Sequence, residues 1–293
     1  MKRSSAFYLT FLFFTLSSIS EAKDDVLAVL SSEMGPYQEA FSGFQEAFGQ
    51  SVEVKHLAAG PLRFRGQPRL VVTFGGKAAV QKYPEGSILI YCMAPGTFVS
   101  LSDHPGVSVD VSMMPKPGDM LHKLKEMQPA MKRLGVLWLS PSFEVYAQGL
   151  RRASGSESVD ILAEKLAKAD GLPDRLRSLQ GHVDALWLPP DPLLLANTAN
   201  IVIIAQFSFA NHIPLYSAVP GLTEQGAVAS LSSSYREIGH AAGRAALEAL
   251  SGRPLPLEVY PETSDAIVNP QAAAKSGITL PQSVLDHAQK VQP

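Results

Sequence analysis

The stretch VDALWLPPDPLLL, residues 183–195, changes from an apolar run into three prolines around Asp191 and then into a second apolar run. A short, continuous apolar run indicates a buried strand, and an aspartate just before an apolar run is a favoured first residue of a helix. Proline lacks an N–H group and holds φ at about −65°, so the turn between the two runs is ordered in advance. The stretch therefore predicts a strand, a rigid turn and a helix.

Strand-like and helix-like runs alternate on both sides of this stretch along almost the whole chain. Strands that alternate with helices favour parallel sheets, and the chain is predicted to be an α/β protein with two such sheets. Parallel sheets of this kind bind ligands at the carboxyl ends of their strands. The predicted strands are residues 26–30, 51–57, 69–74, 87–93, 106–113, 133–139, 159–162, 183–188, 213–217 and 227–233, and the longer predicted helices are 36–48, 116–129, 143–152, 172–179, 193–211 and 234–250.

Residues 1–22 have the pattern of a cleaved signal peptide. Lys2 and Arg3 give a positive start, and the apolar run at 6–16 is shorter than the roughly 20 residues that a membrane-spanning helix needs. Ser20 and Ala22 then supply small side chains at positions −3 and −1 of a cleavage site. We therefore expect export to the periplasm and a mature chain that begins at Lys23.

Composition and charge narrow the class of protein. The chain has 293 residues, 46% of them hydrophobic, and its net charge of −2 gives no indication of binding to nucleic acid. Cys92 is the single cysteine, so no internal disulfide is possible and a buried apolar role is expected for it. There is no Gly-x-Ser-x-Gly motif and the histidines have no metal-ligand spacing. We expect a protein that is not an enzyme and uses no cofactor or metal.

Residues that follow the strands of the first predicted sheet are candidates for ligand binding. Ser31 and Tyr37 offer a hydroxyl group and a ring, although a serine before a helix is more often a cap. Gly75 and Gly76 open a short helix whose N–H groups suit a carboxylate, and the alternative is a tight turn that needs a positive φ. The candidates from this half are Ser31, Tyr37, Thr73, Phe74, Gly75, Gly76 and Ala94.

The second predicted sheet supplies further candidates. Asp191 is expected either to accept a hydrogen bond from a ligand ammonium or hydroxyl group, or to cap the helix that begins near Leu193. The rings of Tyr37, Phe74 and Tyr216 suit an apolar cradle for a ligand, and their alternative place is the core. The candidates from this half are Ser140, Ser142, Phe143, Asp191, Tyr216 and Ser217.

The C-terminal part of the chain resembles a known family. The stretch LTEQGAVASLSSSYREIGHAAGRAALEALSGRPLPLEVYPETSDAIVNPQAAAKSGITLPQSVL, residues 222–285, is similar to the C-terminal signature of the ABC-transporter substrate-binding protein family, which includes tryptophan-binding TrpX-like proteins. VDALWLPPDPLLLAN and KRLGVLWLSPS also resemble segments of that family. The likeness covers nearly the whole mature chain and is weaker before Pro129. The family spacing runs unbroken through Gly226, Tyr235, Gly239, Gly252, Asn269, Gly277 and Pro281.

This resemblance implies a type I periplasmic binding protein. In that fold two Rossmann-like lobes are joined by three crossings of the chain and close like a hinge on a small molecule. The implied partners are a small-molecule ligand, such as an aromatic or other amino acid or a small carboxylate, and an ABC permease in the inner membrane. The protein is expected to be a monomer. The expected boundaries are 1–22 for the signal peptide, 23–114 plus about 234–258 for lobe 1, and 115–233 plus about 263–293 for lobe 2.

Two segments depart from the family pattern. Relatives usually carry a Thr-Asp-Pro-like turn after the strand at 87–93, whereas this chain has Met93, Ala94 and Pro95. A ligand-facing carboxylate is therefore missing from this position in lobe 1, which weakens the expectation of an amino-acid ligand. The crossover at 58–68 is short and rich in proline and glycine, so lobe 1 is expected to lack a full helix there.

The alternative to a function in transport is a function in signalling. A ligand-sensing protein of the same fold would present its closed state to a sensor protein in the membrane.

Overall fold

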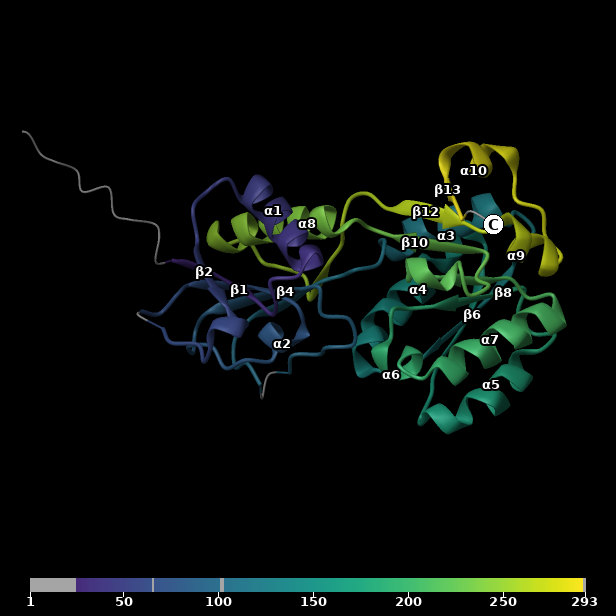
Figure 1. Ribbon diagram of the computed structural model, residues 1–293, viewed down its shortest axis with the longest axis horizontal. Helices are drawn as coiled ribbons and strands as arrows, with labels where there is room; N and C mark the ends of the chain where they lie inside the picture. Colours follow the sequence, from purple (N-terminus) through teal and green to yellow (C-terminus); the bar gives the residue numbers. More distant parts are fainter. Residues whose placement is uncertain (1–24, 65, 101–102, 292–293) are drawn as a thin grey trace, which may run out of the picture.

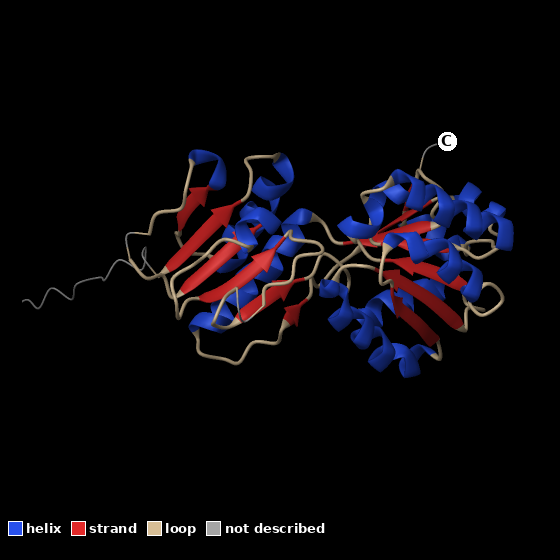
Figure 2. Ribbon diagram, turned by 90° about the horizontal axis from the view of Figure 1, so that it is seen from below, coloured by secondary structure: helices blue, strands red, loops and turns tan. Residues whose placement is uncertain are grey.

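The computed structural model describes residues 25–64, 66–100 and 103–291, which form two lobes side by side (Figure 1). Each lobe is built on one sheet with helices packed against it (Figure 2). The chain passes between the lobes after β5 (Ser108–Val111), after β10 (Ala229–Ser232) and after β11 (Glu258–Val259). The predicted signal peptide lies outside the described residues. Within the described part of the chain, no helix is both long and apolar enough to cross a membrane.

Lobe 1 has a six-stranded sheet in the order β11-β5-β4-β3-β1-β2, with parallel pairing throughout. Helices α1 (Gly35–Phe48) and α8 (Tyr235–Leu250) cover one face of this sheet. Among the described residues, the other face is covered by the short α2 (Gly76–Ala79) and by loop residues that include Leu62, Phe64, Tyr83 and Val99. The remaining strands are β1 (Val26–Leu30), β2 (Glu53–His56), β3 (Leu70–Phe74) and β4 (Ile88–Cys92).

Lobe 2 has a seven-stranded sheet in the order β13-β12-β10-β9-β8-β6-β7. Helices α3 and α4 pack on one face of it, and α5, α6 and α7 pack on the other. The strands are β6 (Arg133–Trp138), β7 (Asp160–Lys165), β8 (Ala185–Leu188), β9 (Leu215–Ser217), β12 (Asp265–Val268) and β13 (Gln289–Lys290), and the helices are α3 (Pro117–Met127), α4 (Glu144–Glu157), α5 (Leu172–Leu179), α6 (Pro192–Leu195), α7 (Thr198–Asn211), α9 (Pro270–Lys275) and α10 (Gln282–His287).

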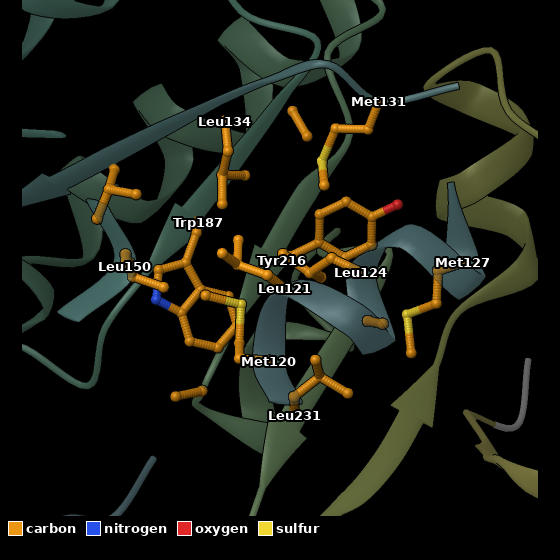
Figure 3. Packing of buried hydrophobic residues seen from close by; sticks show 14 of the residues in the cluster. Met120, Leu121, Leu124, Met127, Met131, Leu134, Leu150, Trp187, Tyr216 and Leu231 are labelled. Carbon is orange, nitrogen blue, oxygen red and sulfur yellow. The ribbon is translucent and has the colours of Figure 1, made fainter. Parts of the chain in front are cut away.

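The core of lobe 2 lies between α3 and the sheet (Figure 3). Met120, Leu121 and Leu124 of α3 are fully buried, and Trp187 and Tyr216 of the sheet lie in the same cluster. Burial of an apolar side chain of this size contributes about 1.5–3 kcal/mol. Helix α3, which follows the first crossing, is therefore packed firmly against the sheet of lobe 2.

Two predicted features differ from the structure. The helix predicted at 193–211 is divided into α6 and α7, because Asn197 has an extended backbone and its side chain accepts a hydrogen bond of 3.0 Å from the N–H of Ala199. An asparagine in this geometry starts a new helix. In addition, β12 runs antiparallel to β10, because the third crossing enters lobe 2 at the same end of the sheet at which β10 leaves it.

The short crossover between β2 and β3 contains a single 3₁₀ turn, Leu57–Ala59, among its described residues.

Helices α1 and α8 make a close contact although they lie far apart in the sequence (Figure 1). A methyl group on Gly239 of α8 would overlap the carbonyl oxygen of Ala40 of α1, and one on Gly43 would overlap that of Arg236. On Gly243 a Cβ atom would lie 2.8 Å from the Cβ atom of Ala47. The glycines thus allow the two backbones to touch.

A charged cluster joins the outer sides of these two helices. His240 lies 3.0 Å from a carboxylate oxygen of Glu46 and 3.0 Å from one of Glu237. The hydrogen bond between His240 and Glu46 raises the pKa of the imidazole and lowers the pKa of the carboxyl group. Burial alone would raise the pKa of Glu237, but hydrogen bonds from His240 and Arg244 outweigh it and the pKa is lowered. All three groups therefore favour their charged forms.

We expect this cluster to give a pH-dependent stabilisation. The part due to the two carboxylates is present above their ordinary pKa of 4.5 and is lost as the pH falls. The part due to His240 is present below its ordinary pKa of 6.5 and is lost as the pH rises through the raised value. His240→Gln should therefore lower the melting temperature clearly at about pH 6 and much less at about pH 9.

Scanning calorimetry at these two pH values measures the difference. His182→Gln is the matched control, because His182 is exposed and its side chain makes none of these contacts. It should leave the melting temperature unchanged at both pH values. An equal deficit at both pH values for His240→Gln would show that the loss does not come from the charge of the imidazole.

Candidate ligand-binding site

The loops at the carboxyl ends of the strands bring the two lobes into contact. A Cβ atom on Gly96, in the loop after β4, would lie 2.6 Å from ring carbons of Pro192 and 3.2 Å from Oγ of Ser140. Gly96 also has a φ of +75°, which glycine adopts without strain. The strand-end loops of lobe 1 and lobe 2 therefore face each other, and a glycine stands where they touch.

Cavities lie between the lobes, and residues of both lobes line them. The smallest, of about 20 Å³, is bordered by Ala94, Ser142 and Phe143. An open groove of about 1100 Å³ has Glu39 and Tyr235 on its lobe 1 side. A third space of about 390 Å³, here called the acidic cavity, is lined by Tyr91, Thr97, Phe98, Val99, Ser100, Ser108, Asp110, Ser142, Val145, Leu257 and Glu258.

The Asp191 carboxylate is fully buried in lobe 2. One oxygen accepts hydrogen bonds from the N–H groups of Leu139 and Ser140, at 2.5 and 2.8 Å. The other accepts from Oγ of Ser140 at 2.5 Å and from the N–H groups of Leu193 and Leu194 at 3.0 and 3.4 Å. Asp191 therefore caps α6, which is one of the two roles considered for it. It also ties the turn after β8 to the turn after β6.

Ser31, Tyr37, Gly75 and Gly76 come together at the ends of β1 and β3. Oγ of Ser31 accepts a hydrogen bond of 2.8 Å from the N–H of Ala78. Gly75 has a φ of +103°, and a Cβ atom there would lie 2.5 Å from Oγ of Ser31 and 2.6 Å from a ring carbon of Tyr37. The glycine pair thus forms a tight turn with a positive φ, the alternative considered for it. A role for this turn in binding a carboxylate stays a prediction.

The rings predicted to form an apolar cradle lie apart. Phe74 is fully buried in the core of lobe 1, edge-on to Phe41 with ring centres 5.6 Å apart. Tyr216 is fully buried in the core of lobe 2, and its hydroxyl group donates to Oε1 of Gln128 at 3.1 Å. Tyr37 alone is partly exposed. Phe74 and Tyr216 therefore occupy the core positions that were the alternative for them.

Thr73 and Ser217 are also buried within their lobes. Oγ of Ser217 donates to the carbonyl oxygen of Leu188 at 3.1 Å and accepts from the N–H of Val219 at 3.0 Å, so it holds the turn after β9. Neither Thr73 nor Ser217 borders the three cavities described above. Among the predicted residues, the structure brings Ala94, Ser142 and Phe143 to the space between the lobes, with Ser140 beside Gly96.

Two acidic residues that the sequence analysis does not single out border the inter-lobe space. Asp110 of β5 and Glu258 of β11 are opposite each other in register and line both the smallest cavity and the acidic cavity. Burial and repulsion by Glu258 raise the pKa of Asp110 well above its ordinary value. Burial also raises the pKa of Glu258, against the opposing effect of hydrogen bonds from Tyr260 and Ser112.

The signal for these residues in the sequence is weak. Asp110 is an acid inside the apolar strand SVDV, which is a visible irregularity, but Glu258 belongs to a two-residue strand without any pattern.

Cys92 is fully buried on β4, as expected, and burial raises the pKa of its thiol. In the described ranges, no group of three or more histidine, cysteine, aspartate or glutamate side chains is placed to hold a metal ion.

Solved structures share this arrangement of two α/β lobes. An ABC domain from Streptococcus pneumonia in complex with L-Trp has a TM-score of 0.59 and 17% identity, covering 92% of this chain and 100% of that chain. A ligand-free, open substrate-binding protein with adhesive properties from Clostridium difficile has a TM-score of 0.59 and 17% identity, covering 91% and 98%. The fold is that of type I periplasmic binding proteins, which confirms the predicted fold class.

Residues 96–292 match the family model described as ABC transporter substrate binding protein. The chain belongs to this family, as the resemblance of its C-terminal part predicted. It is also 23% identical over 154 residues to the tyrosine-binding protein of Clostridioides difficile (strain R20291). That match spans 51% of this chain and 44% of the length of the relative.

Proposed function

We propose that this protein is the extracytoplasmic solute-binding component of an ABC transporter. It captures a small molecule between its lobes and presents the closed form to an ABC permease in the inner membrane. The signal peptide predicted at 1–22 would deliver it to the periplasm, where it acts as a monomer and carries out no catalysis. The observation that supports this most directly is that each inter-lobe cavity is lined by residues of both lobes.

A ligand that contacts both lobes favours the closed arrangement, because it gains contacts there that an open arrangement does not offer. Three crossings join the lobes, and the strand-end loops already meet at Gly96. Closure would bury the ligand between walls that are mostly apolar, with a few polar groups to orient it, as small-molecule sites commonly do.

The proposed ligand class is an aromatic or other amino acid, or a small carboxylate. Two relatives support an aromatic amino acid, since one is named a tyrosine-binding protein and the other is described in complex with L-Trp. The volume of the acidic cavity, about 390 Å³, lies within the range of roughly 300–1,000 Å³ that is usual for such sites.

Thermal shift with the mature chain tests this function. A true ligand should raise the melting temperature progressively, and at a concentration of 100 Kd it should add about 2.7 kcal/mol to the free energy of unfolding. The screen covers amino acids, small carboxylates, sugars and nucleosides, and small-angle scattering on any positive compound should show a smaller radius of gyration. If no compound shifts the melting temperature, or if the protein alone converts a bound compound into a product, the proposal is wrong.

A further inference from the structure

One face of lobe 1 gathers acidic and aromatic side chains at its edge. Tyr91 of β4, Asp110 of β5 and Glu258 of β11 are paired in register across three adjacent strands, so their side chains point to the same face. This is the face that, within the described part of the chain, the short α2 and several loops cover without a long helix. The acidic cavity lies there and is closed from lobe 2 by Ser142 and Val145.

No cationic group of the described residues pairs with the two carboxyl groups in this cavity. Glu258 accepts a hydrogen bond of 2.7 Å from the hydroxyl group of Tyr260. Among the described residues, the carboxyl group of Asp110 takes part in no hydrogen bond or ion pair, although protein surrounds it and the residue lines the cavity. An unpaired carboxylate in such a place is costly, because it has lost water without gaining a partner. The raised pKa of Asp110 agrees with this absence of a counter-charge.

A second observation comes from the other lobe. Oγ of Ser142 is buried and has no hydrogen-bond partner within the described part of the chain. Ser142 lines the same cavity as Asp110 and Glu258. Buried hydroxyl groups are normally paired, so an unpaired hydroxyl group in a residue that lines this cavity is available to a polar group of a ligand. The rest of the wall is largely apolar, with Phe98 and Val145 among its residues.

We propose that the acidic cavity binds the cationic group of a compact organic molecule, an ammonium, amidinium or guanidinium group, between Asp110 and Glu258, with the Ser142 hydroxyl group as a contact from lobe 2. The cation supplies the counter-charge that the carboxyl pair lacks, and the apolar wall receives the body of the molecule. An anionic end group would meet two carboxyl groups and is disfavoured there. This inference rests on the proposed solute-binding function and specifies the charge of its ligand at this position.

Isothermal titration calorimetry with matched probes tests it. Benzamidine and 2-phenylethylamine are the cations, and benzamide and 2-phenylethanol are neutral counterparts of nearly the same shape. The mature protein should bind each cation at least tenfold more tightly than its neutral counterpart. Equal affinity for the two members of a pair would overturn the proposal.

Variants assign the binding to this cavity. Asp110→Asn and Glu258→Gln should each weaken binding of the cations at least tenfold, and Ser142→Ala should weaken it less. Asp110→Asn should also raise the melting temperature at pH 7, because it removes a buried acid that has no partner. The same chemical change at the exposed Asp170 is the matched control and should alter neither property. Cation binding that survives in both Asp110→Asn and Glu258→Gln would contradict the assignment.

The outcome also separates this inference from the proposed function. If the cations do not bind, but a neutral or anionic compound raises the melting temperature and closes the lobes, the cation site is wrong and the solute-binding function stands. If no compound of any charge binds, both are wrong.

Discussion

Asp191→Ala should lower the free energy of unfolding by about 3 kcal/mol, more than the roughly 1 kcal/mol that loss of a helix cap alone costs. The carboxylate accepts from four backbone N–H groups and one hydroxyl group, and these belong to two different turns. Alanine would leave these donors unpaired in a site that excludes water, since Asp191 has no exposed surface. Urea unfolding followed by circular dichroism measures the loss.

Asn197→Ala is the matched control, because Asn197 caps α7 through one hydrogen bond and is exposed. It should cost about 1 kcal/mol. If the two variants lose the same free energy, the link between the turns after β6 and β8 contributes nothing and Asp191 is only a cap.

Gly239→Ala should destabilise the protein by about 3 kcal/mol or more, at the upper end of the usual cost of overpacking. The added methyl group would overlap the carbonyl oxygen of Ala40, and backbone atoms of α1 cannot rotate away as a flexible side chain does. Helix α8 would have to move off α1 and off the face of the sheet that both helices cover. Thermal and urea unfolding should both show the loss.

Gly155→Ala should have the opposite effect on the free energy of unfolding, although it is the same amino-acid change. Gly155 is exposed on α4, and a Cβ atom there would meet nothing within 4 Å. Alanine should therefore stabilise the helix by up to about 1 kcal/mol, because it has the better helix propensity. A destabilisation of similar size at both positions would mean that the close approach of α1 and α8 is not the cause.

The alternation of strands and helices was predictable because it depends on local patterns. Apolar runs located β1 and β3, and the helix predicted at 234–250 is α8, whose first turn is capped by the Ser234 side chain through a hydrogen bond of 3.2 Å from the N–H of Glu237. The direction of β12 was not predictable in this way, because it depends on which lobe the chain comes from. The division of the helix predicted at 193–211 was also missed, because the apolar pattern continues through Asn197 and a single side-chain hydrogen bond starts the new helix there.

The site was predicted less well, and the register of the strands explains why. Phe74 and Tyr216 are still paired with neighbouring strands, so their side chains point into the helix-covered faces. Ala94 and Ser142 lie beyond the last paired residue of their strands, where the chain enters the space between the lobes. A position close to a strand end is therefore not sufficient to predict that a side chain reaches the space between the lobes. Asp110 reaches a cavity from within a paired strand because no long helix covers that part of its sheet.

The backbone contact between α1 and α8 affects how motion is distributed in the molecule. The chain enters α8 directly from the second crossing and leaves toward β11, so a helix without freedom to slide makes lobe 1 turn as one piece. Hydrogen–deuterium exchange should then show two slowly exchanging blocks, one for each sheet with its helices, separated by fast exchange in the connecting segments near residues 112–116 and 260–264.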